Sequence, residues 1–221
     1  MASAIGYGIL YTILMTLIST VIAYLIGLPL GIILQTSAKN GLSPNRPLNS
    51  ILGVFVNILR SIPCLFFIIL LMPVNRAIFN RATGAWYVMI LPLVVSSFAF
   101  IARMVETSLN EVDNELVETF KSMGASRFQI VTKVLLREAV PSLISGLAIS
   151  IVSILGYTAF AYAFGGEGLL ELTYSIYKGN PGQFYKDPNF YLVLMLIVLL
   201  VQVFQESGLK LAKVFDKRRK H

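Results

Sequence analysis

The chain has 221 residues, of which 56% are hydrophobic and 13% charged, and its formal net charge is +7. Soluble globular domains contain about 25% charged residues, so this composition excludes a soluble domain and indicates a membrane protein. The one cysteine, Cys64, excludes a disulfide framework, and the one histidine, His221, ends the chain. We therefore expect no metal site and no cofactor.

Apolar stretches predict an all-α membrane protein with five membrane-spanning helices. Crossing the hydrocarbon core takes about 20 mostly apolar residues. Four stretches meet or nearly meet that length, and the second stretch does so if Arg60 is tolerated near one end. The first stretch is too long for the apolar region of a signal peptide, which has about 7–15 residues, and no basic residue precedes it. We expect one domain over residues 1–221, with spans at about 7–34, 51–75, 86–106, 141–164 and 189–209.

The positions of the basic residues predict the orientation in the membrane. If the N-terminus lies outside, most lysines and arginines fall in cytoplasmic segments, as the positive-inside rule requires. The outer segments then hold only a few: Arg76, Arg81, Lys178 and Lys186. We expect the C-terminus in the cytoplasm, with the basic run 217–220 on anionic membrane lipid rather than on nucleic acid.

Residues that disturb a helix occur in the first two predicted spans. Pro29 lies between Gly27 and Gly31, which predicts a kink or a helix end near the inner end of the first span. The second span is interrupted from Arg60 to Pro63. Arg60 either lies on a pathway through the membrane, or at a hinge with Pro63, or it lies near the inner interface and neutralises helix ends or headgroups.

The third span carries signals at both ends. It starts with Trp86 and Tyr87, as expected of an aromatic belt at the outer interface. Near its inner end, Arg103 and Glu106 have the i, i+3 spacing of an ion pair on a helix. We expect this pair to neutralise itself where the helix leaves the membrane.

The fourth span has a stripe of small residues, which predicts close approach of another helix: Gly146, Ser150 and Ser153. The following segment, 165–188, is rich in Gly, Tyr and Asn. We expect it to form an outer loop before the fifth span.

A highly charged insert, residues 111–138, separates the third and fourth spans. Gly124 stands where a left-handed glycine commonly ends a helix. Ser126 followed by Gln129 fits a capping box that opens a second helix. The apolar residues of the first helix lie at helical spacing: Leu116, Val117, Phe120 and Met123.

In the second helix of the insert, we expect Phe128, Val131 and Leu135 to share one face, joined by Ile130 and Val134. The insert is therefore predicted to be a helix, a glycine turn and a helix. This shape is typical of a socket for a cytoplasmic partner and equally of interfacial helices that link two spans. The spacing does not decide between them.

The insert resembles the cytoplasmic loop of ABC importer permeases. Glu118 is followed six residues later by Gly124 and, ten residues further, by Val134-Leu135-Leu136. The family pattern is Glu-Ala-Ala, three residues, Gly, nine residues, then Ile-x-Leu-Pro. Thr119 and Phe120 replace the two alanines here, and Arg137 replaces the proline.

A wider resemblance, to the permeases of methionine-uptake ABC transporters, covers nearly the whole chain in order. No single segment is specific, but the set is. The matching segments are Asn57–Pro63, Phe100–Glu106, Met123–Ala125, Gln129–Val131, Val134–Leu136, Glu138-Ala139, Pro141 and Gly156-Tyr157.

The resemblance implies the architecture of a type I ABC importer permease in the bacterial inner membrane. Two copies would form the pathway as a homodimer, with an ABC ATPase dimer inside and a solute-binding protein outside. The substrate would be a small amino acid, methionine first, and the chain itself would be no enzyme. The alternatives that stay open are a permease for another small solute and a structural membrane subunit.

The resemblance also implies roles for particular residues. In the family this loop fits a cleft on the ATPase, so the coupling residues would be Glu115, Glu118, Phe120, Met123, Gly124, Ala125, Ser126 and Phe128. The segment 157–164 is far more aromatic than its family counterpart, and its aromatics are either an outer gate or lipid-facing. The pathway and gate candidates are Arg60, Pro63, Tyr157, Phe160, Tyr162 and Phe164.

The residues alone narrow the function class. An ion-coupled carrier needs ionisable groups within the membrane, and Arg60 is the one charge away from the span ends. A self-powered ATPase needs a phosphate cradle such as GxxxxGK[ST], which the sequence lacks. An intramembrane protease needs a Ser–His or paired Asp site, and neither is available. Active transport would therefore take its energy from another chain, through the insert.

Overall fold

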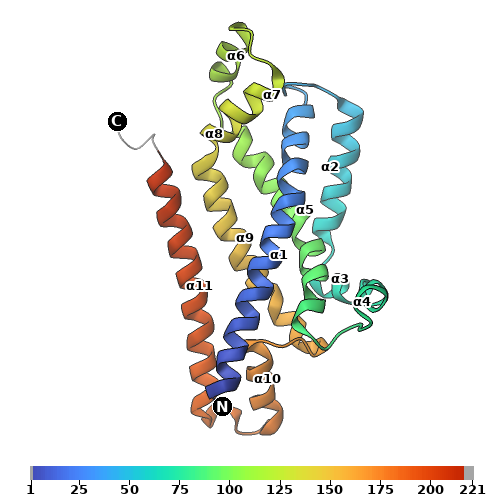
Figure 1. Ribbon diagram of the computed structural model, residues 1–221, viewed down its shortest axis with the longest axis vertical. Coiled ribbons are helices and arrows are strands. Elements are labelled where there is room, and N and C mark those ends of the chain that lie inside the picture. Colours follow the sequence, from blue (N-terminus) through green and yellow to red (C-terminus); the bar gives the residue numbers. More distant parts are fainter. Residues whose placement is uncertain (1, 217–221) are drawn as a thin grey trace. The chain divides into compact units, whose positions relative to one another are not determined.

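The computed structural model describes residues 2–216 and is almost entirely helical, with no strand among those residues. The basic run 217–220, predicted to lie on lipid, falls outside the described residues. In chain order the elements (Figure 1) are α1 (Ala2–Ser37), α2 (Arg46–Ser61), α3 (Cys64–Leu70), α4 (Met72–Phe79), the 3₁₀ helix η1 (Trp86–Met89), α5 (Ile90–Asn110), α6 (Asn114–Ser122), α7 (Arg127–Gln129), the π-helical η2 (Ile130–Leu135), α8 (Leu136–Glu138), α9 (Val140–Ala161), the 3₁₀ helix η3 (Tyr162–Phe164), α10 (Leu169–Gly179), the 3₁₀ helix η4 (Phe184–Lys186) and α11 (Pro188–Phe215).

Within the described residues, four helical stretches are long and apolar enough to cross a membrane: Ser3–Ser37, Trp86–Asn110, Val140–Phe164 and Pro188–Phe215. A fifth crossing is possible if α2 and α3 together count as one span. Those two helices are bent by 94° at the break between Ser61 and Cys64, so the second predicted span is no single straight helix. The all-α membrane fold predicted from the sequence is confirmed.

The chain divides into two compact units. The first unit consists of Met1–Ile22, Ile62–Ser97 and Ser150–Gln205. The second unit consists of Ala23–Ser61, Phe98–Ile149 and Glu206–His221, and it contains the whole insert.

The first unit has a core of buried side chains from several helices. The Asn75 amide, fully buried, donates a 3.1 Å hydrogen bond to the Val88 carbonyl oxygen and fastens α4 to η1. The core cluster consists of Met15, Cys64, Ile68, Met89, Leu93 and Ala161, with Trp86, Tyr157 and Phe164 packed against it.

The segment after the fourth span differs from the prediction, because the expected loop contains the helix α10. Leu169 at its start is fully buried, and its N–H donates to the Thr12 hydroxyl oxygen at 3.0 Å. Leu169, Leu172 and Ile176 repeat at helical spacing. The glycines and asparagines on both sides of this short stretch are typical of loops, so the sequence indicated a loop instead of a helix.

In the second unit, α1 continues through Pro29 to Ser37, so of the two predicted outcomes, a kink or a helix end, the helix end is wrong. The glycines beside the proline have another role. A Cβ on Gly27 would lie 2.8 Å from Ile101 Cγ2, and one on Gly31 would lie 2.6 Å from the Ala102 carbonyl oxygen. These contacts show that the glycines allow α1 to pack directly against the α5 backbone.

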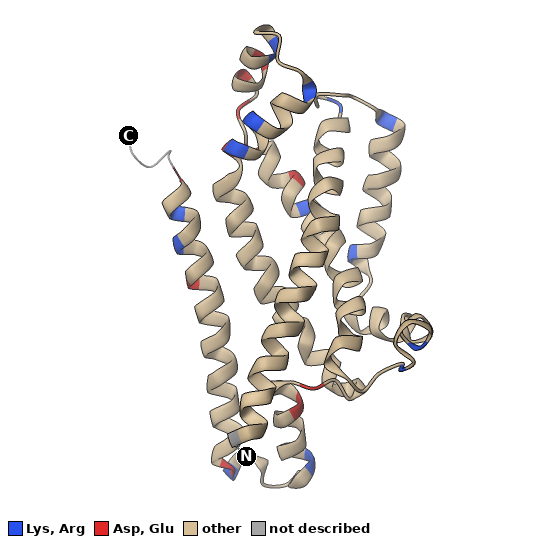
Figure 2. Ribbon diagram, viewed as in Figure 1, with Lys and Arg blue, Asp and Glu red and all other residues tan. Residues whose placement is uncertain are grey.

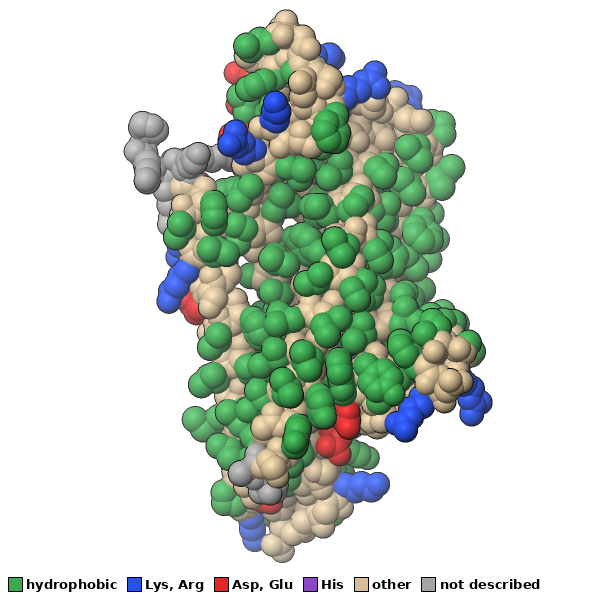
Figure 3. All heavy atoms as spheres, viewed as in Figure 1, with side chains coloured by type: hydrophobic (Ala, Val, Ile, Leu, Met, Phe, Trp, Pro, Cys, Tyr) green, Lys and Arg blue, Asp and Glu red, His purple; other side chains and the backbone are tan. Residues whose placement is uncertain are grey.

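The outer surface is apolar, as a lipid environment requires. In Figure 3 hydrophobic side chains cover much of the visible face, and charged side chains are confined to a few places. Only 6% of the most apolar 18-residue stretch of α11 is buried within the chain. Lipid or another protein must therefore cover most of that helix.

Candidate functional site

The insert begins with a well-capped helix. The Asp113 carboxylate accepts a 2.9 Å hydrogen bond from the Glu115 N–H and so caps the start of α6. An aspartate at this position also suits the positive end of the helix dipole. These contacts fix where the first helix of the insert starts.

α6 ends in the predicted glycine turn. Gly124 has φ +82°, in the left-handed region that glycine occupies without strain. Its N–H donates to the Lys121 carbonyl oxygen at 3.0 Å, and the Ala125 N–H donates to that of Phe120 at 3.1 Å. This pair of bonds is a Schellman motif, so the turn is a defined helix stop.

The predicted capping box is also confirmed. The Ser126 N–H donates to Gln129 Oε1 at 2.8 Å, and the Gln129 N–H donates to the Ser126 hydroxyl oxygen at 3.3 Å. Each residue thus satisfies a backbone donor of the other at the start of α7.

The predicted face of the second helix is wrong at Phe128. Phe128 is 77% exposed, whereas Leu135 is 1% exposed. From Ile130 to Leu135 the chain is π-helical, with hydrogen bonds from i to i+5. The wider turn changes the angle between residues, so positions seven apart no longer share a face. Ile130 and Val134 are buried with Leu135, and η2 packs against α6.

The tip of the insert therefore presents an apolar surface, which we call the docking surface: Phe120, Met123 and Phe128. Met123 and Phe128 are each 77% exposed and Phe120 is 37% exposed. Glu115 and Glu118 are exposed on α6, and Figure 2 shows acidic and basic residues distributed along α6 to α8. Exposed large apolar groups amid charges are typical of a protein interaction site.

All residues predicted to couple to an ATPase are exposed, apart from the half-buried Ala125. The insert that carries them is firmly attached. The Arg127 guanidinium donates to the Ser43 hydroxyl in the loop after α1, and the buried side chains of η2 anchor the other end. The insert is therefore held to the rest of the second unit by Arg127 and by the buried side chains of η2.

The gate candidates of the first unit do not form one cluster. Tyr157 and Phe164 pack against the core cluster. The rings of Tyr162 and Tyr174 are in tilted contact, with centroids 4.8 Å apart, and Phe160 is 43% exposed. Phe160 is thus the candidate in segment 157–164 whose ring is most available for contact with a solute, a lipid or another chain.

The two candidates at the break in the second span have separate positions. Pro63 precedes α3 as its N-cap and is exposed. Arg60 lies in the last turn of α2, in the other unit, and is also exposed. It makes no hydrogen bond or ion pair with any residue that the structure describes.

Arg103 holds α2 against α5, a contact that the spacing did not reveal. The predicted ion pair is present, with Arg103 Nη1 2.6 Å from Glu106 Oε2. In addition, Nη2 donates to the Gly53 carbonyl oxygen and to Asn57 Oδ1, both at 3.0 Å. Gly53 and Asn57 are one turn apart on α2, so both reach the same Arg103 nitrogen. Their distance from Arg103 along the sequence gave no sign of this contact.

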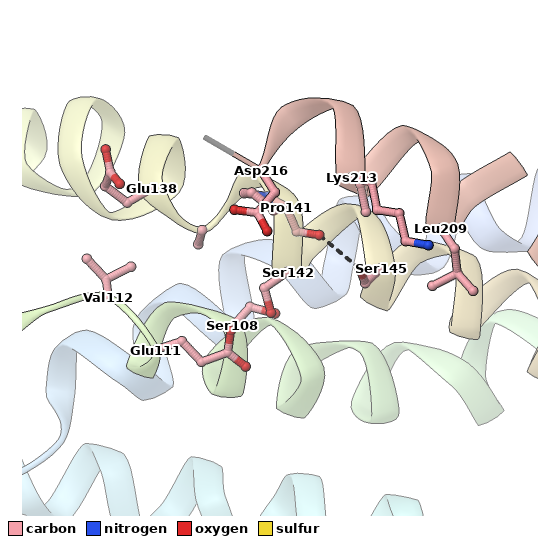
Figure 4. A pocket seen from close by; sticks show the side chains of 12 residues that line it. Ser108, Glu111, Val112, Glu138, Pro141, Ser142, Ser145, Leu209, Lys213 and Asp216 are labelled. Carbon is pink, nitrogen blue, oxygen red and sulfur yellow. Dashed lines mark hydrogen bonds between the residues drawn. The ribbon is translucent and has the colours of Figure 1, made fainter. Parts of the chain in front are cut away.

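The second unit contains a cavity lined by both polar and apolar residues near the start of α9, which Figure 4 shows. It has a volume of about 410 Å³. Ser108 comes from α5, Glu111 from the turn directly after α5, Ser142 and Ser145 from α9, and Lys213 from α11. The Ser145 hydroxyl donates to the Pro141 carbonyl oxygen at 3.0 Å.

A second hollow of about 370 Å³ shares four of these lining residues, and we call it the α5–α9 groove. The Ser142 hydroxyl donates to the Ser108 hydroxyl at 3.0 Å and joins α9 to α5. The groove is lined by the charged residues Arg60, Arg103 and Glu111, the hydroxyls of Thr107, Ser108, Ser142 and Ser145, and the apolar Phe100, Met104, Gly146 and Ile149.

Residues 27–219 match the model of a protein family described as the binding-protein-dependent transport system inner membrane component. The chain belongs to this family. Its spans and its insert are therefore those of a multi-pass inner-membrane permease, and the resemblance found in the sequence is confirmed.

Two relatives of this chain are both named as permease proteins of methionine transport systems. The probable D-methionine transport system permease protein of Vibrio cholerae is 37% identical over 193 residues, covering 86% of this chain and 83% of its own length. The methionine import system permease protein of Bacillus subtilis is 37% identical over 187 residues, covering 84% and 82%.

Solved structures show the type I importer permease fold. A chain from the inward-facing MetNI methionine ABC transporter matches with a TM-score of 0.91 and 33% identity, covering 98% of both chains. A chain from an amino acid ABC transporter solved with histidines matches with a TM-score of 0.72 and 18% identity, covering 98% of this chain and 94% of the other. This second match supports the fold alone.

Proposed function

We propose that the chain is the transmembrane subunit of an ATP-driven importer of methionine. The observation that carries the proposal is the match to the methionine transporter chain over 98% of both chains. The curated relatives named as methionine permeases cover most of the chain as well. Orientation follows the basic residues, with the N-terminus outside and the C-terminus in the cytoplasm.

The proposed complex contains two copies of this chain, an ABC ATPase dimer and an extracytoplasmic solute-binding protein. The docking surface supports the ATPase contact, because Met123 and Phe128 are largely exposed although the apolar residues Ile130, Val134 and Leu135 of the neighbouring η2 are buried. The low burial of α11 within one copy is compatible with a second copy or with lipid.

The proposed mechanism is alternating access driven from the cytoplasmic side. ATP binding draws the two ATPases together and moves both docking surfaces. The insert transmits this motion because its turn and caps are hydrogen-bonded and three apolar side chains of η2 are buried. The substrate and the nucleotide each shift the equilibrium by binding one state more tightly than the other.

Reconstitution tests this function directly. The chain is purified from its native membranes in mild detergent, and co-purifying proteins are identified by mass spectrometry. An ATPase recovered at one copy per permease supports the assignment. The complex and the binding protein are then placed in proteoliposomes, where we expect ATP-dependent uptake of labelled methionine. A chain that is recovered without an ATPase, or a complete complex that leaves methionine outside, would refute the proposal.

A further inference from the structure

Arg60 is the less engaged of the two arginines that line the α5–α9 groove. Arg103, the other groove arginine, is occupied, because Nη1 pairs with Glu106 and Nη2 donates to two groups of α2. Its remaining nitrogen, Nε, is buried and out of a ligand's reach. Arg60, by contrast, is exposed and makes no hydrogen bond or ion pair with the described residues.

Contacts along the groove place Arg60 at its apolar end. The Ser142 hydroxyl donates to Ser108, and a Cβ added to Gly146 would lie 3.0 Å from Met104 Cε. Because the contact on α5 moves back along the chain as the contact on α9 moves forward, the two helices run antiparallel. Phe100 lies eight residues before Ser108, or about 12 Å along α5. α2 also runs antiparallel to α5 (Figure 1). Arg60 follows the Arg103 contact by about one turn, which brings it to the level of Phe100.

This end of the groove combines a free guanidinium with an apolar wall. A guanidinium is planar and presents five N–H donors, a geometry that matches a carboxylate in two parallel hydrogen bonds. Phe100, Met104 and Ile149 line the same groove. A thioether packs well against aromatic and aliphatic side chains. The site therefore suits a carboxylate that carries an apolar side chain.

We propose that Arg60 binds the α-carboxylate of the transported amino acid, whose side chain lies against Phe100, Met104 and Ile149. The proposal rests on the function inferred above and adds a substrate contact to it. A second source of anion with the same chemistry is the phosphate of an anionic lipid, and the test separates the two.

The first test measures uptake in proteoliposomes that hold the whole transporter with its ATPase and binding protein. We expect Arg60→Gln to lower methionine uptake about ten- to hundredfold, as for the loss of a hydrogen bond to a charged group. Arg60→Lys should keep part of the activity. Arg46→Gln is the matched control, since Arg46 is exposed on the same helix and lies outside the groove.

The second test reports on the groove itself. Ile149→Cys is introduced in a Cys64→Ser background, and a small thiol reagent labels position 149 in the ATPase-bound complex. Methionine should slow labelling when Arg60 is present, whereas methionine amide, which lacks the carboxylate, should not. In Arg60→Gln, methionine should lose this effect.

The outcomes distinguish the two proposals. Full methionine uptake by Arg60→Gln would overturn the carboxylate contact and leave the importer assignment intact. Failure of the unaltered transporter to take up methionine would instead overturn the proposed function. If phosphatidylglycerol vesicles slow the labelling of position 149 whether or not methionine is present, the groove holds lipid phosphate and the substrate contact is wrong.

Discussion

At the scale of single residues, Gly124 determines the shape of the docking surface. Its φ of +82° costs a β-branched side chain about 1–3 kcal/mol, although a Cβ there would meet nothing within 4 Å. A β-branched residue at position 124 would therefore act through backbone strain, not through a clash, and would displace the next two residues, Ala125 and Ser126.

We expect Gly124→Val to lower the amount of methionine transported per ATP hydrolysed about tenfold, while the protein still folds. The ratio is measured in proteoliposomes with the ATPase and binding protein present. Gly124→Asn is the control, because asparagine tolerates the left-handed region, and it should retain most of the coupling. Normal coupling in the valine variant would show that the turn does not transmit force.

Glu118 carries a negative charge beside the docking surface, and a substitution there tests the contribution of this charge to ATPase binding. It is exposed on α6, so reversing its charge should leave the fold intact. Glu118→Lys is expected to weaken ATPase association several-fold, corresponding to about 1 kcal/mol for a rim charge. Co-purification at low and high salt measures the effect, which should shrink as salt screens the charge. Unchanged association at low salt would remove Glu118 from the interface.

Phe160 is the exposed aromatic among the gate candidates of segment 157–164. If its ring restricts the outer end of the pathway, Phe160→Ala should raise the ATP-independent leak of methionine several-fold, because a ring that excludes solute is lost. Phe66→Ala, at another exposed aromatic, should leave the leak unchanged. Equal leak from both variants would indicate that Phe160 faces lipid.

At the scale of elements, the packing of α1 on α5 depends on the absence of a side chain at Gly31. Even a methyl group there would come within 2.6 Å of the Ala102 carbonyl oxygen and of Val105 Cβ. Such overpacking typically costs about 1–3 kcal/mol.

We therefore expect Gly31→Ala to lower the thermal unfolding temperature of the detergent-purified protein by several degrees. Gly6→Ala, in the same helix, has no neighbour within 4 Å of the new methyl group and should unfold at or slightly above the original temperature. If both variants unfold at the same temperature, α1 does not pack on α5 as closely as described.

Short-range signals in the sequence predicted the insert well. A Schellman turn and a capping box need only neighbouring residues, so Gly124, Ser126 and Gln129 were sufficient to place them. The π-helical turn of η2 was not predictable, because it follows from burying Ile130, Val134 and Leu135 together. The exposure of Phe128 depends on that turn.

At the scale of the whole molecule, composition and hydropathy predicted the membrane class, and the family comparisons confirmed it. The contacts between distant segments were beyond sequence reasoning. Arg103 could be paired with Glu106 from their spacing, but its bonds to Gly53 and Asn57 join helices about fifty residues apart in the chain. The groove next to Arg60 depends on the same long-range packing.

The length of α1 has a further consequence. With 36 residues it is about 54 Å long, whereas the hydrocarbon core of a bilayer is about 30 Å thick. A helix of this length must tilt or extend beyond the hydrocarbon. The loop after α1 holds Ser43, which accepts the hydrogen bond from Arg127. A tilt of α1 would therefore also move the loop that holds Ser43, and with it the Arg127 contact that ties this loop to the insert.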